Sequence, residues 1–279
     1  YIRRALRIFP IYYLLLFLLL GINFANVREL APWLFSYTLN FYEIYKGTYL
    51  DSFSHLWSLS VEEQFYLFWP MLLLFIPAKR IVLFIISAIA FSILLRTGFY
   101  IFTENWLISS LFTLTNMHAL GLGALLAWLT LHKHSFLKKI NNPIWIYIGV
   151  VLYILSVYLL RRNVLWYRVV LDDLFFAIVS VLIIYRASYG GFRFAAKWIL
   201  EHPIVVYGGK ISYGMYLYHL FMPQLFYYCS PKIGLGISNK YTFFIALCTL
   251  TYVMAHLSWT LIEKPLNRLK IYFPYTSKQ

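Results

Sequence analysis

Residues 54–70 read SHLWSLSVEEQFYLFWP and place two adjacent carboxylates, Glu62 and Glu63, directly before an apolar stretch. A charged side chain at the depth of a lipid bilayer costs about 2.5–3.5 kcal/mol on insertion scales, so an acid there is a candidate for a functional site. Adjacent residues on a helix diverge by about 100°, so we expect at most one carboxylate to face a common site. Both acids could instead pair with arginines as structural counter-ions.

The composition indicates a membrane protein. Hydrophobic residues make up 62% of the chain and charged residues only 12%, with a mean hydropathy of +0.70. A water-soluble domain carries roughly a quarter charged residues. The net charge of +14 is more typical of cytoplasmic loops in a membrane protein than of a nucleic-acid partner, so we predict no nucleic acid.

About eight apolar runs are long enough to cross about 30 Å of hydrocarbon as helices. They lie near residues 5–24, 57–77, 81–102, 112–131, 144–160, 168–185, 206–228 and 242–263. No repeat or flexible linker divides the chain. We therefore predict an all-α, polytopic integral-membrane helix bundle that forms one domain over residues 1–279. The bilayer is its first partner.

Basic residues cluster in the loops that this arrangement places on one side of the membrane. The clusters are Arg3, Arg4 and Arg7; Lys79 and Arg80; Lys133, Lys138 and Lys139; Arg186, Arg193 and Lys197; and Lys264, Arg268 and Lys270. The positive-inside rule assigns that side to the cytoplasm. An even number of spans then puts both ends of the chain there.

Four motifs follow one another in the chain: RRALRIFPIYY at 3–13, SHLWSLSVEEQFYLFWP at 54–70, ISYGMYLYH at 211–219 and LIEKP at 261–265. In this order they resemble the acyltransferase 3 family of integral-membrane acyltransferases, over essentially the whole chain. The resemblance implies transfer of an acyl group, usually acetyl, from cytoplasmic acyl-CoA to hydroxyls of cell-envelope or secreted carbohydrates, and so a bacterial plasma membrane.

The family also uses an arginine and a catalytic histidine in its first span, and this chain does not contain that motif. We therefore expect the chain to begin after the family's first two spans and to be unable to catalyse acyl transfer as given. A histidine fits the chemistry because it can take a hydroxyl proton near neutral pH.

The expected donor is acyl-CoA, most simply acetyl-CoA, and no metal is expected. Arg4 and Arg7 are three residues apart and share a helix face, and guanidinium groups match phosphate oxygens in pairs. Simple positive-inside anchoring is the alternative interpretation. The family's corresponding motif is implicated in donor handling, and this implies a cofactor-binding role for Arg3, Arg4 and Arg7.

For the acceptor end, Glu62, Glu63 and His219 are the catalytic candidates. The candidates for binding the carbohydrate are His55, Trp57, Tyr66 and Tyr213. Family members often carry Arg and Asp near Asn116 and His118, and this sequence departs from them there.

Two other function classes stay open: a polytopic membrane transporter, and a noncatalytic remnant of the acyltransferase. A transporter would be favoured by repeat symmetry, which the sequence does not show. Five glycines are expected to let helices approach closely, namely Gly121, Gly123, Gly208, Gly209 and Gly214.

Overall fold

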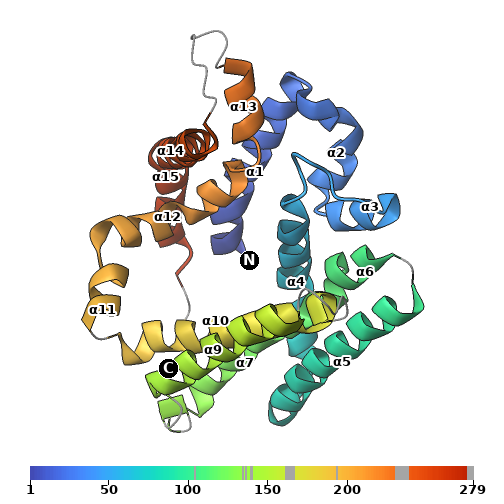
Figure 1. The fold of residues 1–279 in the computed structure, drawn as a ribbon, viewed down its shortest axis with the longest axis vertical. Helices are drawn as coiled ribbons and strands as arrows, with labels where there is room; N and C mark the ends of the chain where they lie inside the picture. The colour runs from blue at the N-terminus through green and yellow to red at the C-terminus, as the bar shows by residue number, and fades with distance from the viewer. Residues whose placement is uncertain are drawn as a thin grey trace. The chain divides into compact units, whose positions relative to one another are not determined.

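A computed structural model describes residues 1–103, 105–133, 135, 137–138, 141–160, 167–192, 194–229 and 239–274. Within these residues every regular element is helical, which confirms the all-α prediction (Figure 1). The α-helices are α1 (Ile2–Gly21), α2 (Val27–Phe35), α3 (Leu39–Lys46), α4 (Leu56–Phe75), α5 (Ile81–Phe102), α6 (Trp106–Leu111), α7 (Met117–His132), α9 (Pro143–Leu160), α10 (Asp172–Tyr185), α11 (Phe194–Leu200), α12 (Pro203–Tyr218), α13 (Met222–Cys229), α14 (Lys240–Ser258) and α15 (Lys264–Arg268). Short 3-10 or π turns are η1 (Phe24–Asn26), η2 (Ala78–Arg80), η3 (Thr113–Asn116), η4 (Tyr167–Leu171), η5 (Arg186–Gly190), η7 (Trp259–Glu263) and η8 (Leu269–Tyr272).

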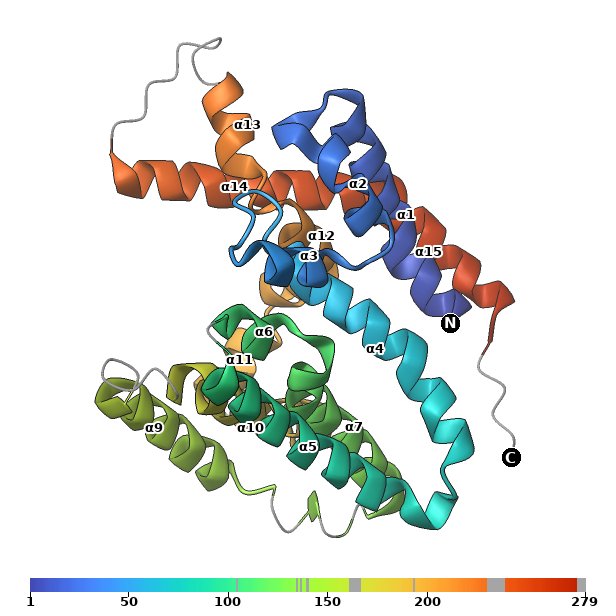
Figure 2. The same cartoon turned by 90° about the vertical axis from the view of Figure 1, so that its right-hand side faces the viewer.

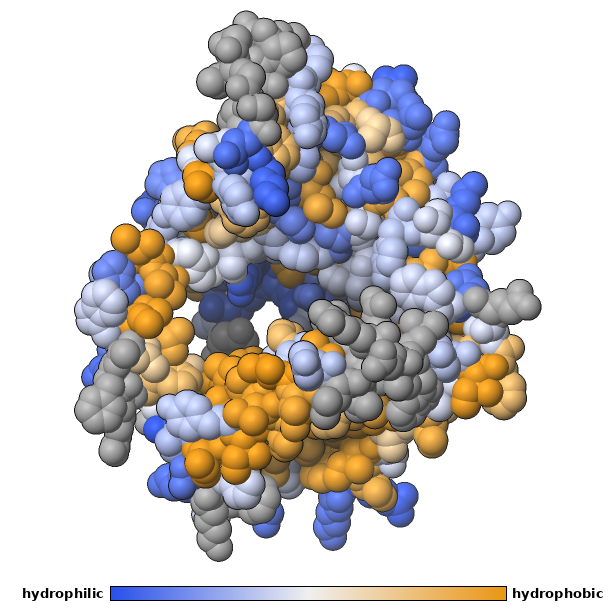
Figure 3. Space-filling view, in the orientation of Figure 1, coloured by the Kyte–Doolittle hydropathy of each residue, from blue (hydrophilic) through white to orange (hydrophobic). Residues whose placement is uncertain are grey.

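Four helical stretches of the described chain are long and apolar enough to cross a membrane. They are Ile2–Gly21, Ala78–Phe102, Thr113–His132 and Lys240–Tyr272. The predicted count of eight spans is therefore not confirmed. Apolar side chains also gather on the outer face of α9, where Val151, Ile154 and Tyr158 are all more than 60% exposed (Figure 3). Such a face suits contact with lipid rather than water.

The predicted continuous span over 206–228 is wrong, because the helix is interrupted. Helix α12 ends at Tyr218 and α13 begins at Met222, so His219–Phe221 lie between them. Pro223 has no backbone N–H to donate and fits the first turn of a new helix better than the middle of a long one. Two other predicted spans, 144–160 and 168–185, correspond to α9 and to η4 followed by α10.

The internal contacts of the chain divide it into two compact units. Unit 1 comprises Tyr1–Ser36, Leu50–Leu56 and Ile199–Gln279, and unit 2 comprises Tyr37–Tyr49 and Trp57–Trp198. Compact units within one helical bundle need not be separate domains. The assignment of residues 1–279 to one domain stays a prediction.

In unit 1, α12 packs against α14, and the start of α1 contacts α15 and η8 (Figure 2). Backbone carbonyls of the last turn of α2 accept hydrogen bonds from tyrosines of α1: Tyr12 donates to Leu34 O at 2.8 Å and Tyr13 to Phe35 O at 3.2 Å. Because Arg3 Nη1 also donates to Lys270 O at 2.9 Å, the two ends of this unit lie together. The side of the membrane that they face stays a prediction.

In unit 2, α5 packs against α7, and α10 packs against α7 and α9. A buried apolar cluster of Phe65, Trp69, Ile85 and Met117 joins α4, α5 and α7, with the rings of Phe65 and Trp69 stacked at 5.0 Å. In lipid, the contact between such helices is stabilised mainly by van der Waals packing.

The glycines confirm this view of packing only in part. A Cβ atom at Gly121 would lie 2.7 Å from Ile89 Cγ1, and one at Gly214 would lie 3.3 Å from Ala255 Cα. These two glycines therefore permit close helix contact, as predicted. The prediction is wrong for Gly123, Gly208 and Gly209, where an added Cβ would meet no atom within 4 Å in the described structure.

Candidate functional site

Unit 1 brings His55 and His219 side by side. His55 ends the turn before α4 and is only 8% exposed, while His219 follows the last residue of α12 and is exposed. The ring centroids lie 4.9 Å apart, and the ring of Tyr216 lies 5.5 Å from that of His55. Tyr216 OH donates a hydrogen bond to His55 O, so α12 holds the backbone as well as the ring of His55.

The hydrogen bonds of His55 determine which ring nitrogen carries the proton. Its Nε2 lies 3.2 Å from Leu217 O, and a carbonyl can only accept, so Nε2 must donate. Nδ1 therefore carries the lone pair, and this buried atom has no hydrogen-bond partner in the described structure. Burial, reinforced by neighbouring His219, lowers the pKa of His55 from 6.5 to about 4.

The low pKa defines what His55 can do chemically. The ring is neutral at pH 7, and a base with a pKa of about 4 is weak at that pH. A neutral Nδ1 is nevertheless a good hydrogen-bond acceptor for a hydroxyl group. This geometry fits the predicted carbohydrate-binding role of His55.

His219, unlike the buried His55, is exposed to solvent. Its Nδ1 lies 2.6 Å from Tyr216 O, so Nδ1 donates and Nε2 carries the lone pair of an exposed ring. An exposed imidazole can exchange protons with solvent, which suits a base. Tyr213, the remaining candidate on α12, is half-buried and donates to Ile8 O at 3.2 Å. Its contact holds α12 against α1.

The predicted donor arginines differ from one another. Arg3 Nη1 donates to Lys270 O and to Phe273 O, both at 2.9 Å, and this ties α1 to the C-terminal segment. Arg4 is half-buried and Arg7 is exposed. Arg7 lies within electrostatic range of Glu263, the acid of the LIEKP motif.

Glu263 is 3% exposed, and its Oε1 accepts a hydrogen bond from Ser258 Oγ at 2.7 Å. A Cβ atom at position 214 would lie 3.3 Å from the same carboxylate oxygen. Gly214 of the ISYGMYLYH motif therefore leaves room for the acid of the LIEKP motif. The two motifs, about 50 residues apart in the sequence, did not by themselves predict this contact.

The adjacent acids of α4 belong to unit 2 and diverge as predicted. Glu63 is 9% exposed, whereas Glu62 is exposed. Trp57, on the same helix, is half-buried. Tyr66 packs beside the apolar cluster, with its ring 5.4 Å from that of Phe65. Its surroundings are those of a packing residue, and its predicted contact with carbohydrate stays untested.

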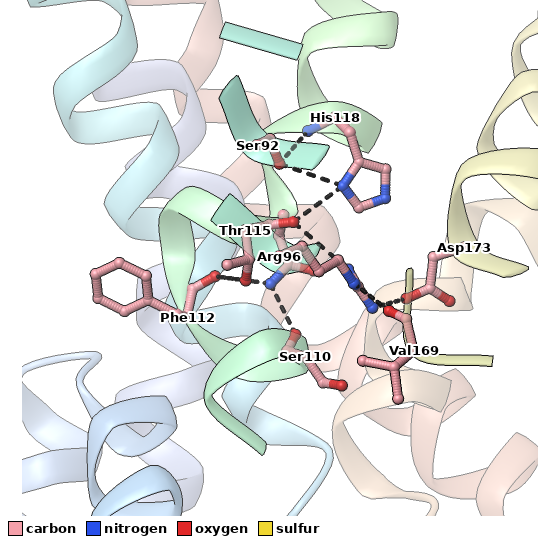
Figure 4. A network of polar contacts seen from close by, with 9 residues as sticks. Ser92, Arg96, Ser110, Phe112, Thr115, His118, Val169 and Asp173 are labelled. Carbon is pink, nitrogen blue, oxygen red and sulfur yellow. Dashed lines mark hydrogen bonds and ion pairs between the residues drawn. The ribbon is translucent and has the colours of Figure 1, made fainter. Parts of the chain in front are cut away.

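Sequence reasoning missed a buried polar network in unit 2, centred on Arg96 (Figure 4). Arg96 lies on α5 and is 2% exposed; its guanidinium donates to Val169 O and pairs with the carboxylate of Asp173 on α10. The sequence offered a signal, because an arginine within an apolar span and an acid at the start of another are both costly in lipid unless they are paired.

His118, one of the two residues at which we expected a departure from the family pattern, lies in this network (Figure 4). His118 Nδ1 lies 3.0 Å from Thr115 O, so this nitrogen donates and Nε2 carries the lone pair. Ser92 Oγ accepts from the backbone N–H of His118 at 3.0 Å. Asn116 Nδ2 donates to Ser110 O at 2.8 Å, which holds the turn before α7.

Each unit also contains an apolar cavity. The one in unit 1, of about 400 Å³, lies between α1, α13 and α14 and has Tyr218 and Ser258 among its lining residues. The one in unit 2, of about 630 Å³, lies beside Tyr66 and Trp128. Among the residues that the structure describes, no group of three His, Cys, Asp or Glu side chains is placed to hold a metal ion.

Comparisons with known proteins agree with the motifs. The acyltransferase 3 family, described as an acyltransferase domain, matches residues 1–262. A Staphylococcus aureus (strain COL) protein named "Putative O-acetyltransferase" is 29% identical over 297 residues, covering 96% of this chain and 47% of the relative. O-acetyltransferase OatA of Staphylococcus aureus (strain NCTC 8325 / PS 47) is 26% identical over 233 residues, covering 78% of this chain and 37% of OatA.

The chain thus spans about half the length of the curated relatives it matches, or less. No solved structure matches it. The family match nevertheless extends over nearly all of the chain, from α1 to the start of the LIEKP motif, and includes Arg3, His55 and His219. The chain belongs to the acyltransferase 3 family.

Proposed function

We propose that the chain is the membrane part of an O-acyltransferase. It transfers an acyl group, most simply acetyl, from cytoplasmic acyl-CoA to a hydroxyl group of a cell-envelope or secreted carbohydrate, such as a polysaccharide or lipopolysaccharide. Membership of the family and the names of its relatives, which are O-acetyltransferases, support acyl transfer. The donor, the acceptor and a bacterial plasma membrane with both chain ends in the cytoplasm are part of the proposal.

The observation that carries the proposal is the pair of neighbouring imidazoles in unit 1. His55 offers a buried lone pair on Nδ1, and His219, 4.9 Å away between ring centroids, offers an exposed one on Nε2. A sugar presents neighbouring hydroxyl groups, so one hydroxyl can donate to His55 Nδ1 and the next to His219 Nε2. Positioning of this kind is a main source of rate enhancement in group transfer.

The reaction then follows from ordinary acyl-transfer chemistry. The acceptor hydroxyl oxygen attacks the thioester carbonyl carbon, so a C–O bond forms and the C–S bond breaks. In this proposal His219, rather than the histidine that the resemblance places in the family's first span, is the general base. The hydroxyl proton passes to its Nε2 and from there to the departing thiolate of coenzyme A. His55 Nδ1 accepts a hydrogen bond from a neighbouring hydroxyl of the sugar and so holds the reacting hydroxyl in position.

The charged residues complete the proposal. Arg4 and Arg7 bind donor phosphates, because guanidinium groups match phosphate oxygens and α1 presents both residues near one end of the unit. Of the two carboxylates of α4, buried Glu63 is the stronger catalytic candidate and exposed Glu62 the weaker one. Trp57 and Tyr213 are proposed to border the acceptor.

The test uses the full-length protein in bacterial cells that lack acetylation of their own surface glycan. Ester-linked acetyl groups are released by mild alkali and counted for wild type, His219→Ala and His55→Ala. Loss of a general base typically lowers the rate by about a hundredfold to ten-thousandfold, which is the expected result for His219→Ala. His55→Ala should mainly raise the acceptor KM.

His132→Ala is the matched control, because His132 is an exposed histidine at the end of α7 whose Nδ1 contacts only its own helix at Trp128 O. Its acetylation should equal that of wild type. Equal acetylation by His219→Ala and wild type would remove His219 from the mechanism. A wild-type protein that adds no acyl group but moves a solute across vesicles would replace the proposal with the transporter interpretation.

A further inference from the structure

The apolar cavity of unit 1, of about 400 Å³, runs along one face of α1. Six residues of this region line it at helical spacing: Ile11, Leu14, Leu15, Leu18, Leu19 and Ile22. At a rise of about 1.5 Å per residue, this stripe is about 16 Å long. Because α1 comprises Ile2–Gly21, the cavity extends from the middle of the helix to its C-terminal end.

The dimensions of the cavity match one hydrocarbon chain of one leaflet. Half of a hydrocarbon core about 30 Å thick is about 15 Å, close to the length of the stripe. A volume of about 400 Å³ over that length gives a mean cross-section of about 25 Å², whereas a helix about 10 Å across occupies about 80 Å². The cavity is therefore too narrow for another helix.

The cavity is open on one side and closed on the other. Leu18 and Ile22, with Leu261 of η7, line it and are between 61% and 73% exposed. Ile11 and Met222 also line it and are only 2% and 3% exposed. Both open walls belong to helical stretches that are apolar and long enough to cross a membrane, so the opening faces lipid.

Water is a poor occupant of this cavity. Among the described residues that line it, only Tyr218 and Ser258 have a polar side chain. Ser258 Oγ already donates to Glu263 Oε1 at 2.7 Å. A buried water molecule needs about two to four polar partners, so two hydroxyl groups cannot hydrate a space of this size. Hydrocarbon from the bilayer fits the lining better.

The end of the cavity near the C-terminus of α1 borders the imidazole pair. The rings of Phe24 and Phe221 both line this end, with their centroids 5.8 Å apart. The ring of Phe221 also lies 5.3 Å from that of His55. A single side chain therefore separates the cavity from His55.

We propose that this cavity binds one hydrocarbon chain of a bilayer lipid, which enters between α1 and η7. The methyl end of the chain lies near Ile11, in the middle of the membrane. The head group lies at the level of Phe24 and Phe221, beside His55. This lipid site does not depend on acyl transfer, and the proposed function does not require it.

The experiment is photo-crosslinking of the full-length protein in phosphatidylcholine nanodiscs. A small fraction of the lipid carries a diazirine in one acyl chain, either at the methyl end or next to the carbonyl group, and mass spectrometry identifies the labelled residues. The probe at the methyl end should label Ile11, and the probe next to the carbonyl should label Met222. Both side chains are buried, so lipid that only coats the outer surface does not reach them.

Filling the cavity should remove this labelling. Leu225→Trp adds a large side chain at a half-buried residue of the lining and should reduce labelling of Met222 to background. Met254→Phe fills the cavity from α14 and serves the same purpose if circular dichroism shows that Leu225→Trp does not fold. Leu83→Trp is the matched control, since Leu83 lies on α5 of unit 2 and is 64% exposed, and it should label as wild type does.

Three results would overturn the proposal. Labelling confined to exposed Leu18 and Leu261 would show that lipid only coats the surface. Absence of label at Ile11 and Met222 in wild type would mean that another part of the full-length protein, or a second copy, fills the cavity. Equal labelling of Met222 in folded Leu225→Trp and in Leu83→Trp would show that the lipid chain does not use the cavity.

One further variant separates this inference from the proposed function. His219→Ala keeps every residue that lines the cavity, so it should label as wild type does even where it transfers no acyl group. Labelling that fails in wild type while acyl transfer depends on His219 would remove the lipid site and keep the proposed function.

Discussion

His55 in unit 1 and His118 in unit 2 have the same local chemistry in different surroundings. Each is buried, each donates one ring N–H to a backbone carbonyl, and each leaves the other nitrogen without a hydrogen-bond partner in the described structure. His55 lies beside a second imidazole, whereas His118 lies in a network with Ser92 and Arg96. The neighbours, rather than the histidine itself, therefore separate a candidate binding residue from a structural one.

The strongest way to test this contrast is to break the ion pair near His118. Arg96 is 2% exposed while the Asp173 side chain is 58% exposed, so the two partners differ in what their loss leaves behind. Asp173→Ala strands a buried guanidinium and should destabilise the protein by about 3–5 kcal/mol. Arg96→Met leaves a carboxylate that solvent can reach, and should cost less.

Thermal unfolding in detergent, followed by circular dichroism, measures both variants. An apolar replacement of both partners, Arg96→Met with Asp173→Leu, should recover part of the loss, because no buried charge then remains unpaired. If Asp173→Ala proved as stable as wild type, the network would not support unit 2. If Asp173→Ala instead lost acyl transfer but kept its stability, the network around His118 would have a functional role, and the contrast between His118 and His55 would be wrong.

A second test uses the pH dependence of stability at His55. Its folded pKa of about 4 lies below the ordinary value of 6.5, so between these values the unfolded chain binds a proton that the folded protein does not. Stability should therefore fall as the pH falls from 6.5 towards 4, by about 3 kcal/mol, and should not change through this group above 6.5. The groups that face His55 are Tyr216, His219 and Phe221.

The measurement compares unfolding of wild type and His55→Gln between pH 4 and 8. Because Gln does not titrate in this range, the difference between the two curves isolates His55 from all other groups. A constant difference across the range would show that His55 is protonated as easily in the folded protein as in the unfolded chain.

The smallest expected effect concerns the support of His55. Tyr216 OH donates to His55 O, and Tyr216→Phe removes that bond while keeping the ring, at a cost of about 1 kcal/mol. The acceptor KM should rise as the position of His55 becomes less defined. Tyr228→Phe is a control on the exposed surface of α13 and should change neither stability nor KM. Equal KM values for Tyr216→Phe and wild type would make the hydrogen bond dispensable.

Helical periodicity was enough to predict several features of the fold and site. The low charge content and long apolar runs implied an all-helical membrane protein, because only such runs can bury their backbone polar groups in lipid. The divergence of Glu62 and Glu63 followed from the 100° turn per residue, about the same in every α-helix. The four motifs implied the family, which the match over residues 1–262 shows.

Other features depended on interactions between distant parts of the chain. A hydropathy pattern could not reveal that the span over 206–228 breaks at His219, because apolar residues continue on both sides of the break. It also gave no partner for Arg96, which pairs with the carboxylate of Asp173, 77 residues away on another helix. Nor could it show that Arg3 donates to the backbone carbonyl of Lys270, 267 residues away.

The sequence by itself determined the class of protein, its all-helical character and its family, because length, hydropathy and motif order are properties of the chain alone. Tertiary structure alone decided that His55 is buried and neutral with a lone pair on Nδ1, and that Arg3 holds the segment containing Lys270. The physical reason is that a buried polar atom must find its partner wherever packing brings one, and most such partners are remote in sequence.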